Sequence, residues 1–138
     1  MSNRTFTIIK PDSVRKGNFG RIISRLEAEG FRIIGLKKVA LGQRQAEGFY
    51  AVHRERPFFS SLVQYMTSGP VYVAALEREN AVATLRQVMG ATDPLKADAN
   101  TIRKEFGESI EQNAIHGSDS DENAKIEISY FFAESELV

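Results

Sequence analysis

The spacing of the apolar residues is the feature of this sequence that most limits its fold. Four strand-like runs, at residues 5–10, 31–41, 71–76 and 113–116, alternate with longer segments of helical period. Runs rich in Ile, Val and Phe are typical of strands, whereas stripes at i, i+3 and i+4 are typical of amphipathic helices. The alternation predicts an α/β chain (an α+β sandwich). We expect a ferredoxin-like four-stranded antiparallel sheet covered by helices first, and a small doubly wound sheet second.

The helical segments have recognisable ends. Residues 20–29 place Ile22 and Leu26 on one stripe, and Gly30 follows as a C-terminal cap. We expect two further helices at 43–53 and 58–66, which Pro57 separates. We also expect a helix at 80–89, which Asn80 could cap, and one at 121–129, whose first residues are acidic. Residues 90–101 lack a period and predict a loop, with one or two helical turns following in residues 101–106.

Length and composition exclude several classes of protein. A chain of 138 residues with 42% hydrophobic residues suits a single domain over 1–138. The absence of cysteine excludes a disulfide framework, a zinc-thiolate site and a thiol nucleophile. The 18 basic and 18 acidic residues balance, which argues against a nucleic acid or an anionic membrane as partner. No apolar run approaches the ~20 residues of a membrane span, so we expect a soluble, cytoplasmic protein.

Common phosphate and metal motifs are missing. The sequence has no G-x-x-x-x-G-K-[ST] loop, no G-x-G-x-x-G, no protein-kinase signature and no G-x-S-x-G elbow. The segment from Asp119 begins like a calcium loop, but Ala124 stands where that loop needs Gly and Tyr130 where it needs Glu. Any chemistry must therefore come from side chains that lie apart in the sequence.

His116 is the better nucleophile candidate of the two histidines. His53 lies on a predicted helix, where a surface or packed histidine is the commoner outcome. His116 ends a predicted strand and precedes a small polar turn, Gly-Ser-Asp-Ser, which would expose it. Glu122 and Glu127 follow on the next helix, and a carboxylate beside an imidazole can fix its tautomer. From spacing alone, a structural role for His116 stays equally open.

Arg86 and Arg103 flank the irregular loop that contains Thr92. Two guanidiniums facing one loop could clamp phosphate oxygens, although two solvated surface arginines are the simpler interpretation of this spacing. Lys10 ends the first strand, where either a surface charge or a ligand contact fits. Phe58 offers an aromatic face at a helix start, with core packing as the alternative.

Taken together, six segments resemble the nucleoside diphosphate kinase family along essentially the whole chain. They occur in the family's order, and the last is the family's highly specific active-site signature: Thr-Ile-Ile-Lys-Pro-Asp (7–12), Pro-Phe-Phe (57–59), Met-Thr-Ser-Gly-Pro (66–70), Met-Gly-Ala-Thr-Asp-Pro (89–94), Thr-Ile-Arg (101–103) and Asn-Ala-Ile-His-Gly-Ser-Asp-Ser (113–120).

The resemblance implies ping-pong transfer of the terminal phosphate of a nucleoside triphosphate, mainly ATP, to a nucleoside diphosphate, ribo or deoxy. His116 would carry the phosphate. The other implied roles are contacts to ribose and phosphates (Lys10, Asn113), base stacking (Phe58), holding of the phosphate chain (Arg86, Thr92, Arg103), proximity to the histidine (Tyr50, Ser118) and its orientation (Glu127). The family uses Mg²⁺ carried on the nucleotide phosphates, which implies no metal site on the protein.

The resemblance also implies a homo-oligomer. The segment after Phe132 is short, so a tetramer, a dimer and a hexamer all stay open. The sequence departs from the family pattern at Asn100, where Gly is usual, and at Lys104-Glu105; Asn tolerates a left-handed conformation. The rival hypothesis is a non-catalytic nucleotide-binding regulatory module on the same fold, which would keep Phe58 and the arginines without needing an exposed histidine.

Overall fold

The computed structural model describes residues 3–138 and contains one four-stranded sheet. Its strands lie in the order β2-β3-β1-β4, and each neighbouring pair is antiparallel. Their bounds are Arg4–Ile9 (β1), Arg32–Val39 (β2), Val71–Glu77 (β3) and Ile115–Gly117 (β4). The order and the antiparallel pairing confirm the ferredoxin-like expectation and rule out the doubly wound parallel sheet.

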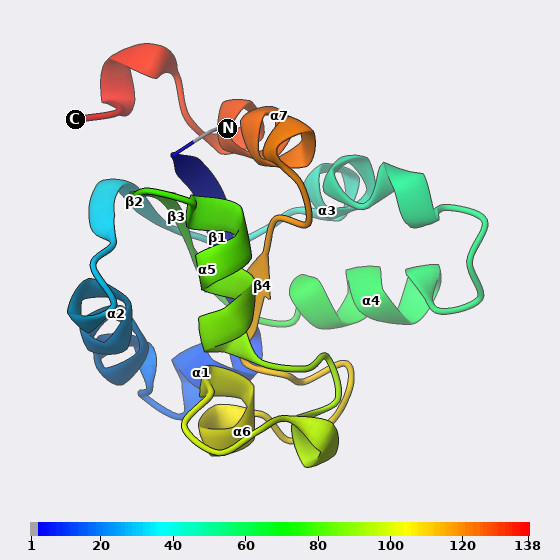
Figure 1. Ribbon diagram of the computed structural model, residues 1–138. Coiled ribbons are helices and arrows are strands. Elements are labelled where there is room, and N and C mark those ends of the chain that lie inside the picture. The colour runs from blue at the N-terminus through cyan, green and yellow to red at the C-terminus, as the bar shows by residue number, and fades with distance from the viewer. Residues whose placement is uncertain (1–2) are drawn as a thin grey trace.

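Helices cover both faces of the sheet (Figure 1). On one side lie α2 (Phe19–Ala28), α5 (Ala81–Met89) and α6 (Ile102–Phe106); on the other lie α3 (Gln43–Phe49), α4 (Phe59–Met66) and α7 (Asp121–Phe131). Shorter helices complete the connections: α1 (Pro11–Arg15) after β1, and 3-10 helices at Ala51–His53, Pro94–Lys96 and Glu134–Glu136.

β1 is the centre of the core. Its side chains alternate, so Phe6 and Ile8 enter the layer under α4 and α7, and Ile9 enters the layer under α2 and α5. All three are fully buried, and the Phe6 ring stacks on Phe131 with centroids 5.4 Å apart. Packing on both faces therefore fixes the strand at whose end Lys10 lies.

Two local expectations are confirmed by backbone geometry. Gly30 has φ of 90°, its N–H donates to Glu27, and the N–H of Phe31 donates to Leu26, which together end α2 in a Schellman motif. Asn100, at the position where Gly is usual, has φ of 70°, as its tolerance of the left-handed region allows.

Four local expectations need correction. The helix expected over 43–53 ends at Phe49, before Pro57, because Tyr50 leaves the helical conformation and a 3-10 turn follows. Asn80 stands at the N-cap of α5, but with φ of 55° its side chain makes no cap hydrogen bond. The strand expected over 113–116 begins only at Ile115, since Ala114 has φ of 75°. The expected loop 90–101 contains a short 3-10 helix, Pro94–Lys96.

Hydroxyl caps start the two helices that flank β4. Thr101 Oγ1 accepts the N–H of Lys104 at the start of α6, and Ser120 Oγ accepts the N–H of Asn123 at the start of α7. Helix α7 then runs to Phe131, two residues beyond the expected end. The caps fix the residues at which α6 begins before β4 and at which α7 begins directly after it.

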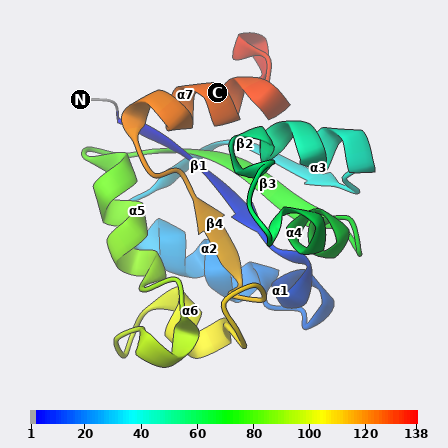
Figure 2. The same cartoon turned by 90° about the vertical axis from the view of Figure 1, so that its right-hand side faces the viewer.

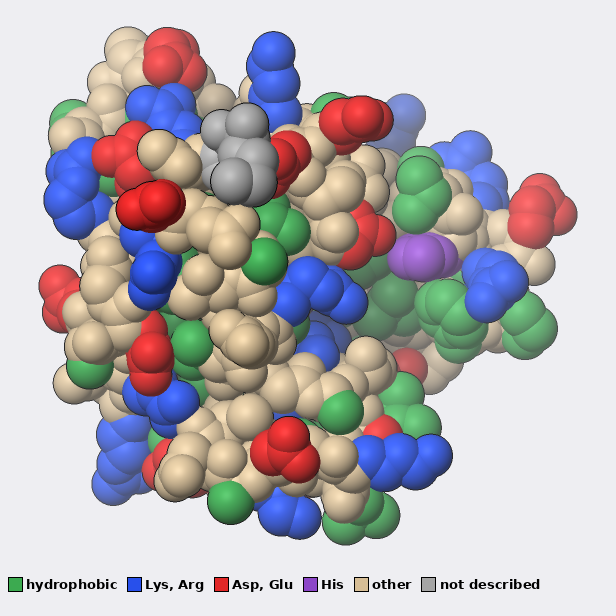
Figure 3. All heavy atoms as spheres, in the orientation of Figure 1, with side chains coloured by type: hydrophobic (Ala, Val, Ile, Leu, Met, Phe, Trp, Pro, Cys, Tyr) green, Lys and Arg blue, Asp and Glu red, His purple; other side chains and the backbone are tan. Residues whose placement is uncertain are grey.

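The surface in Figure 3 mixes charges of both signs, in keeping with the net charge of zero. Hydrophobic side chains gather at the right, where α4 and the segment before it project in Figure 1. This projecting segment contains Val52, 88% exposed, and Phe58, 43% exposed.

Candidate functional site

β4 lies at the edge of the sheet and carries His116. The strand pairs with β1, and His116 lies opposite Ile8, so its ring is on the α3, α4 and α7 side of the sheet. The Thr7 hydroxyl donates to the His116 carbonyl at 2.7 Å. Figure 2 shows β4 facing the viewer, with α5 and α6 on one side, α3 and α4 on the other and α7 above. Side chains from both layers can therefore meet beside this edge.

The His116 ring is oriented by a carboxylate. Its Nε2 lies 2.9 Å from Glu127 Oε1, and the Ser118 hydroxyl donates to the same oxygen at 2.8 Å. An ionised carboxylate only accepts hydrogen bonds, so Nε2 carries the hydrogen and a neutral ring has its lone pair on Nδ1. Glu122, the other carboxylate considered from the sequence, is exposed. Glu127 is thus the residue that sets the tautomer.

Aromatic rings surround the imidazole. The centroids of Phe6, Phe49 and Tyr50 lie 6.3, 5.5 and 6.5 Å from that of His116, each at a steep interplanar angle. The Tyr50 hydroxyl is buried, with no hydrogen-bond partner among the described residues. Burial, reinforced by the charge of Glu127, raises the pKa of Tyr50 above its ordinary value. Tyr50 therefore remains a protonated donor beside His116.

Lys10 connects the end of β1 to the irregular loop. Its Nζ donates to Asn113 Oδ1 at 2.7 Å, and Asn113 Nδ2 donates to the Thr92 carbonyl at 3.0 Å. Burial lowers the pKa of Lys10 to about 8; Arg103 acts in the same direction, and the carboxylates of Asp12 and Glu111 oppose it. A bound anion would restore the favourable environment that the buried ammonium lacks.

Arg103 is a fixed positive charge behind the loop. Its Nη1 donates to the Gly90 carbonyl at 3.1 Å and its Nη2 to the Ile115 carbonyl at 2.8 Å, while its Nε is buried without a partner among the described residues. Burial, followed by the charge of Arg86, lowers the pKa of Arg103 to about 10. Arg86, Thr92 and Arg103 line one hollow of about 370 Å³. The two arginines thus line a common space, which is suited to an anion.

Phe58 lies outside these contacts, at the N-cap of α4. Its ring packs on His53, with centroids 5.4 Å apart, and the Arg56 guanidinium lies 5.7 Å above it. With 43% of its surface exposed, the ring keeps a face available for a ligand. The structure therefore gathers the residues named from the sequence into two groups and leaves Phe58 apart on the projecting segment. Four lie around the imidazole (His116, Glu127, Ser118 and Tyr50), and five lie around the irregular loop (Lys10, Asn113, Thr92, Arg86 and Arg103).

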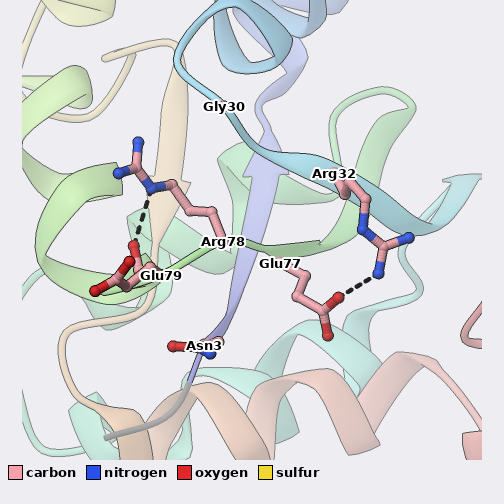
Figure 4. A pocket seen from close by; sticks show the side chains of 6 residues that line it. All are labelled: Asn3, Gly30, Arg32, Glu77, Arg78 and Glu79. Carbon is pink, nitrogen blue, oxygen red and sulfur yellow. Dashed lines mark hydrogen bonds and ion pairs between the residues drawn. The ribbon is translucent and has the colours of Figure 1, made fainter.

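A larger hollow lies at the opposite end of the sheet and differs in character (Figure 4). Arg32 pairs with Glu77 there, and Arg78 Nε donates to the Glu79 carbonyl at 2.9 Å. Glu77 faces Arg4 at the start of β1, whereas Lys10 follows its end, roughly 20 Å away for a six-residue strand. Because Glu77 neutralises Arg32 and the Arg78 guanidinium is already bound to the backbone carbonyls of Glu29 and Glu79, this hollow is a poor phosphate site.

Sequence reasoning missed the parts of the site that hold other groups in place. The carbonyls that fix Arg103 and the Phe6 and Phe49 rings around His116 have no local signature, because only folding brings them there. Among residues 3–138, no group of three or more acidic or histidine side chains could hold a metal ion. No helix in that range is long and apolar enough to cross a membrane.

Comparison with known proteins agrees with this geometry. The family model described as nucleoside diphosphate kinase matches residues 3–137. A nucleoside diphosphate kinase of Granulibacter bethesdensis is 64% identical over 135 residues, covering 98% of this chain and 96% of that protein. One from Geobacter sulfurreducens is 57% identical over 135 residues, with 98% of both chains covered.

Solved structures extend the likeness to three dimensions. The nucleoside diphosphate kinase of Aquifex aeolicus superposes with a TM-score of 0.96 at 46% identity, covering 99% of each chain. A halophilic nucleoside diphosphate kinase from Halobacterium salinarum, solved in complex with CDP, gives 0.95 at 41% identity, covering all of this chain and 92% of that one.

Proposed function

Because this chain belongs to the nucleoside diphosphate kinase family and transfers phosphate between nucleotides, we propose that it does so in two steps through a phosphohistidine at His116. The observation that carries this proposal is the hydrogen bond from Nε2 to Glu127, which leaves the lone pair of Nδ1 available.

In the first step, Nδ1 of His116 attacks the terminal phosphorus of a nucleoside triphosphate. A P–N bond forms, the P–O bond to the β-phosphate breaks, and the nucleoside diphosphate leaves with the bonding electrons. The ring gains positive charge as the P–N bond forms, and the Glu127 carboxylate stabilises that charge through Nε2–H. A different diphosphate then attacks the phosphohistidine, and the same bonds change in reverse.

The buried donors near His116 support this chemistry. The unpartnered Tyr50 hydroxyl would donate to an oxygen of the transferred phosphate, and Ser118 holds Glu127 in place. Arg86 and Arg103 would neutralise the phosphate chain from the hollow that they line, with Thr92 beside them. None of these side chains needs to move a proton, since phosphoryl transfer depends mainly on position and charge.

The nucleotide would lie between this hollow and the projecting segment. Lys10 and Asn113 would contact its ribose and phosphates, and Phe58 would stack on its base; a relative solved with CDP supports a nucleotide site. Stacking accepts every base, which suits an enzyme whose donor and acceptor differ. We include Mg²⁺ in the proposal as an ion carried by the nucleotide phosphates, where it would offset their negative charge.

Three broader proposals accompany the mechanism. Residues 1–138 would act as one domain, the chain would form a homo-oligomer, and it would work in the cytoplasm. Light scattering coupled to size-exclusion chromatography distinguishes the dimer, tetramer and hexamer from a monomer. A monomeric mass for the active protein would contradict the oligomer.

The proposed reaction is tested by labelling. Incubation with γ-labelled ATP and Mg²⁺ should give an acid-labile, base-stable label that GDP removes, and His116→Ala should give none. His53→Ala is the matched control, because that ring packs on Phe58 rather than beside Glu127, and it should label normally. A label that survives in His116→Ala would overturn the role of His116, and no label on the wild type would overturn the covalent mechanism and favour the non-catalytic binding module.

A further inference from the structure

A buried hydrogen-bonded cluster behind the site has no part in the proposed chemistry. It joins Asp12 in α1, Tyr65 in α4 and Ala114 just before β4, which are 1%, 8% and 0% exposed. Burial this complete keeps the Asp12 carboxylate away from any substrate. Its influence on the reaction must therefore pass through the residues that it holds and through its charge, which raises the pKa of Lys10.

Ala114 forms a strained turn at the junction of two halves of the site. Its φ is 75°, and the N–H of Ile115 donates to the Asn113 carbonyl at 2.9 Å, which closes a γ-turn of the rare positive-φ type. Asn113 contacts Lys10 on one side of this turn, and the Ile115 carbonyl accepts from Arg103 on the other. The shape of the turn thus sets where Asn113 stands relative to His116.

Asp12 and its neighbours satisfy the backbone of this turn. The N–H of Ala114 donates to Asp12 Oδ2 at 3.1 Å, and the carbonyl of Ala114 accepts the N–H of Lys10 at 2.9 Å. The Tyr65 hydroxyl donates to Asp12 Oδ1 and accepts the N–H of Asp12 at 2.8 Å. Both oxygens of the carboxylate are therefore engaged, and Tyr65 fixes its orientation.

We propose that Asp12 is a positioning residue for phosphoryl transfer: oriented by Tyr65, it keeps Ala114 in the strained turn and so keeps Asn113 in register with Lys10 and the nucleotide. This proposal rests on the reaction at His116 put forward above. His116 itself is anchored separately, by the pairing of β4 with β1 and by Glu127. Loss of Asp12 should therefore impair the nucleotide side of the site and spare the histidine.

Asp12→Asn tests this division, because an amide keeps the shape but cannot accept from both the Ala114 N–H and the Tyr65 hydroxyl as the carboxylate does. Phosphate transfer from ATP to GDP should fall by about 10- to 100-fold, the range expected when reacting groups are displaced by about 1 Å. Phosphorylation of His116 by phosphoramidate, a donor without a nucleoside, should stay within about twofold of the wild type. Equal losses with both donors would mean that Asp12 serves folding alone, and would overturn the proposal.

Two further variants keep the test decisive. Glycine adopts positive φ without strain, so adding Ala114→Gly to Asp12→Asn should restore transfer from ATP at least severalfold; a double variant as slow as Asp12→Asn would also refute the proposal. Tyr65→Phe should show the same donor-selective loss in weaker form. Tyr72→Phe, a matched loss of a hydroxyl in a ring that stacks on Phe19, should show none. Failure of the underlying reaction is distinguishable, because the wild type would then take no label from either donor.

Discussion

The Glu127 carboxylate offers the sharpest quantitative test of the site. One oxygen, Oε1, receives both the Nε2–H of His116 and the hydroxyl of Ser118, and the side chain is only 18% exposed. Glu127→Gln keeps the volume and one acceptor but removes the charge. The imidazole would then develop positive charge in the transition state beside a neutral amide.

The expected loss follows from the strengths of the two kinds of hydrogen bond. A bond to a charged group contributes about 1.5–3 kcal/mol net and a neutral one about 0.5–1.5 kcal/mol. The difference of about 1–1.5 kcal/mol corresponds to a roughly 5- to 12-fold slower phosphorylation of His116. Glu127→Ala removes the whole interaction and should slow the step by about 12- to 150-fold.

Rapid-quench labelling with γ-labelled ATP measures this step directly, and thermal unfolding verifies that each variant is folded. Glu122→Gln, on the same helix but exposed, is the matched control and should react like the wild type. A Glu127→Gln rate within twofold of the wild type, or a Glu127→Ala rate no slower than Glu127→Gln, would refute the proposed role of the carboxylate.

Other consequences concern charge, backbone and stacking. The pKa of Lys10 is lowered to about 8, and phosphate binds the charged form of Lys10, so the contribution of Lys10 to ATP affinity is complete below that pH and is lost as the pH rises through it. The KM for ATP, measured from pH 7 to 9.5, should therefore climb above pH 8 in the wild type but not in Lys10→Arg, whose guanidinium stays charged. A flat wild-type profile would contradict this. Asn100 has φ of 70° and is exposed, so Asn100→Gly should unfold in urea no more easily than the wild type. Asn100→Ala should lower the free energy of unfolding by about 1 kcal/mol, and equal stabilities of the two variants would argue against left-handed strain at this position. Stacking on Phe58 is worth about 1–3 kcal/mol per base, so Phe58→Ala should raise the KM for ATP, GTP and CTP alike by about 5- to 150-fold. Phe58→Tyr should leave these KM values nearly unchanged, and an increase confined to one base would speak against stacking.

The structure accounts for the wrong local predictions. Gly30 and Asn100 could be assigned positive φ from sequence, because both residue types favour that region. Ala114 could not, since alanine carries no such preference and takes φ of 75° only where Asp12 and Lys10 bond its backbone. Helix α3 ends earlier than expected for a similar reason: packing of Phe49 and Tyr50 around His116 overrides local propensity.

The class of the fold and the family follow from the residues alone, because hydrophobic periodicity and short ordered motifs are local properties. The same motifs, through the resemblance that they carry, also supplied the residues of the site. How those residues meet depends on tertiary packing: β4 pairs with β1, and α7 then brings Glu127 to His116 while Lys10 reaches Asn113. The positioning role proposed for Asp12 depends wholly on tertiary structure, since its partners Tyr65 and Ala114 lie 53 and 102 residues away in the sequence and no local pattern links them.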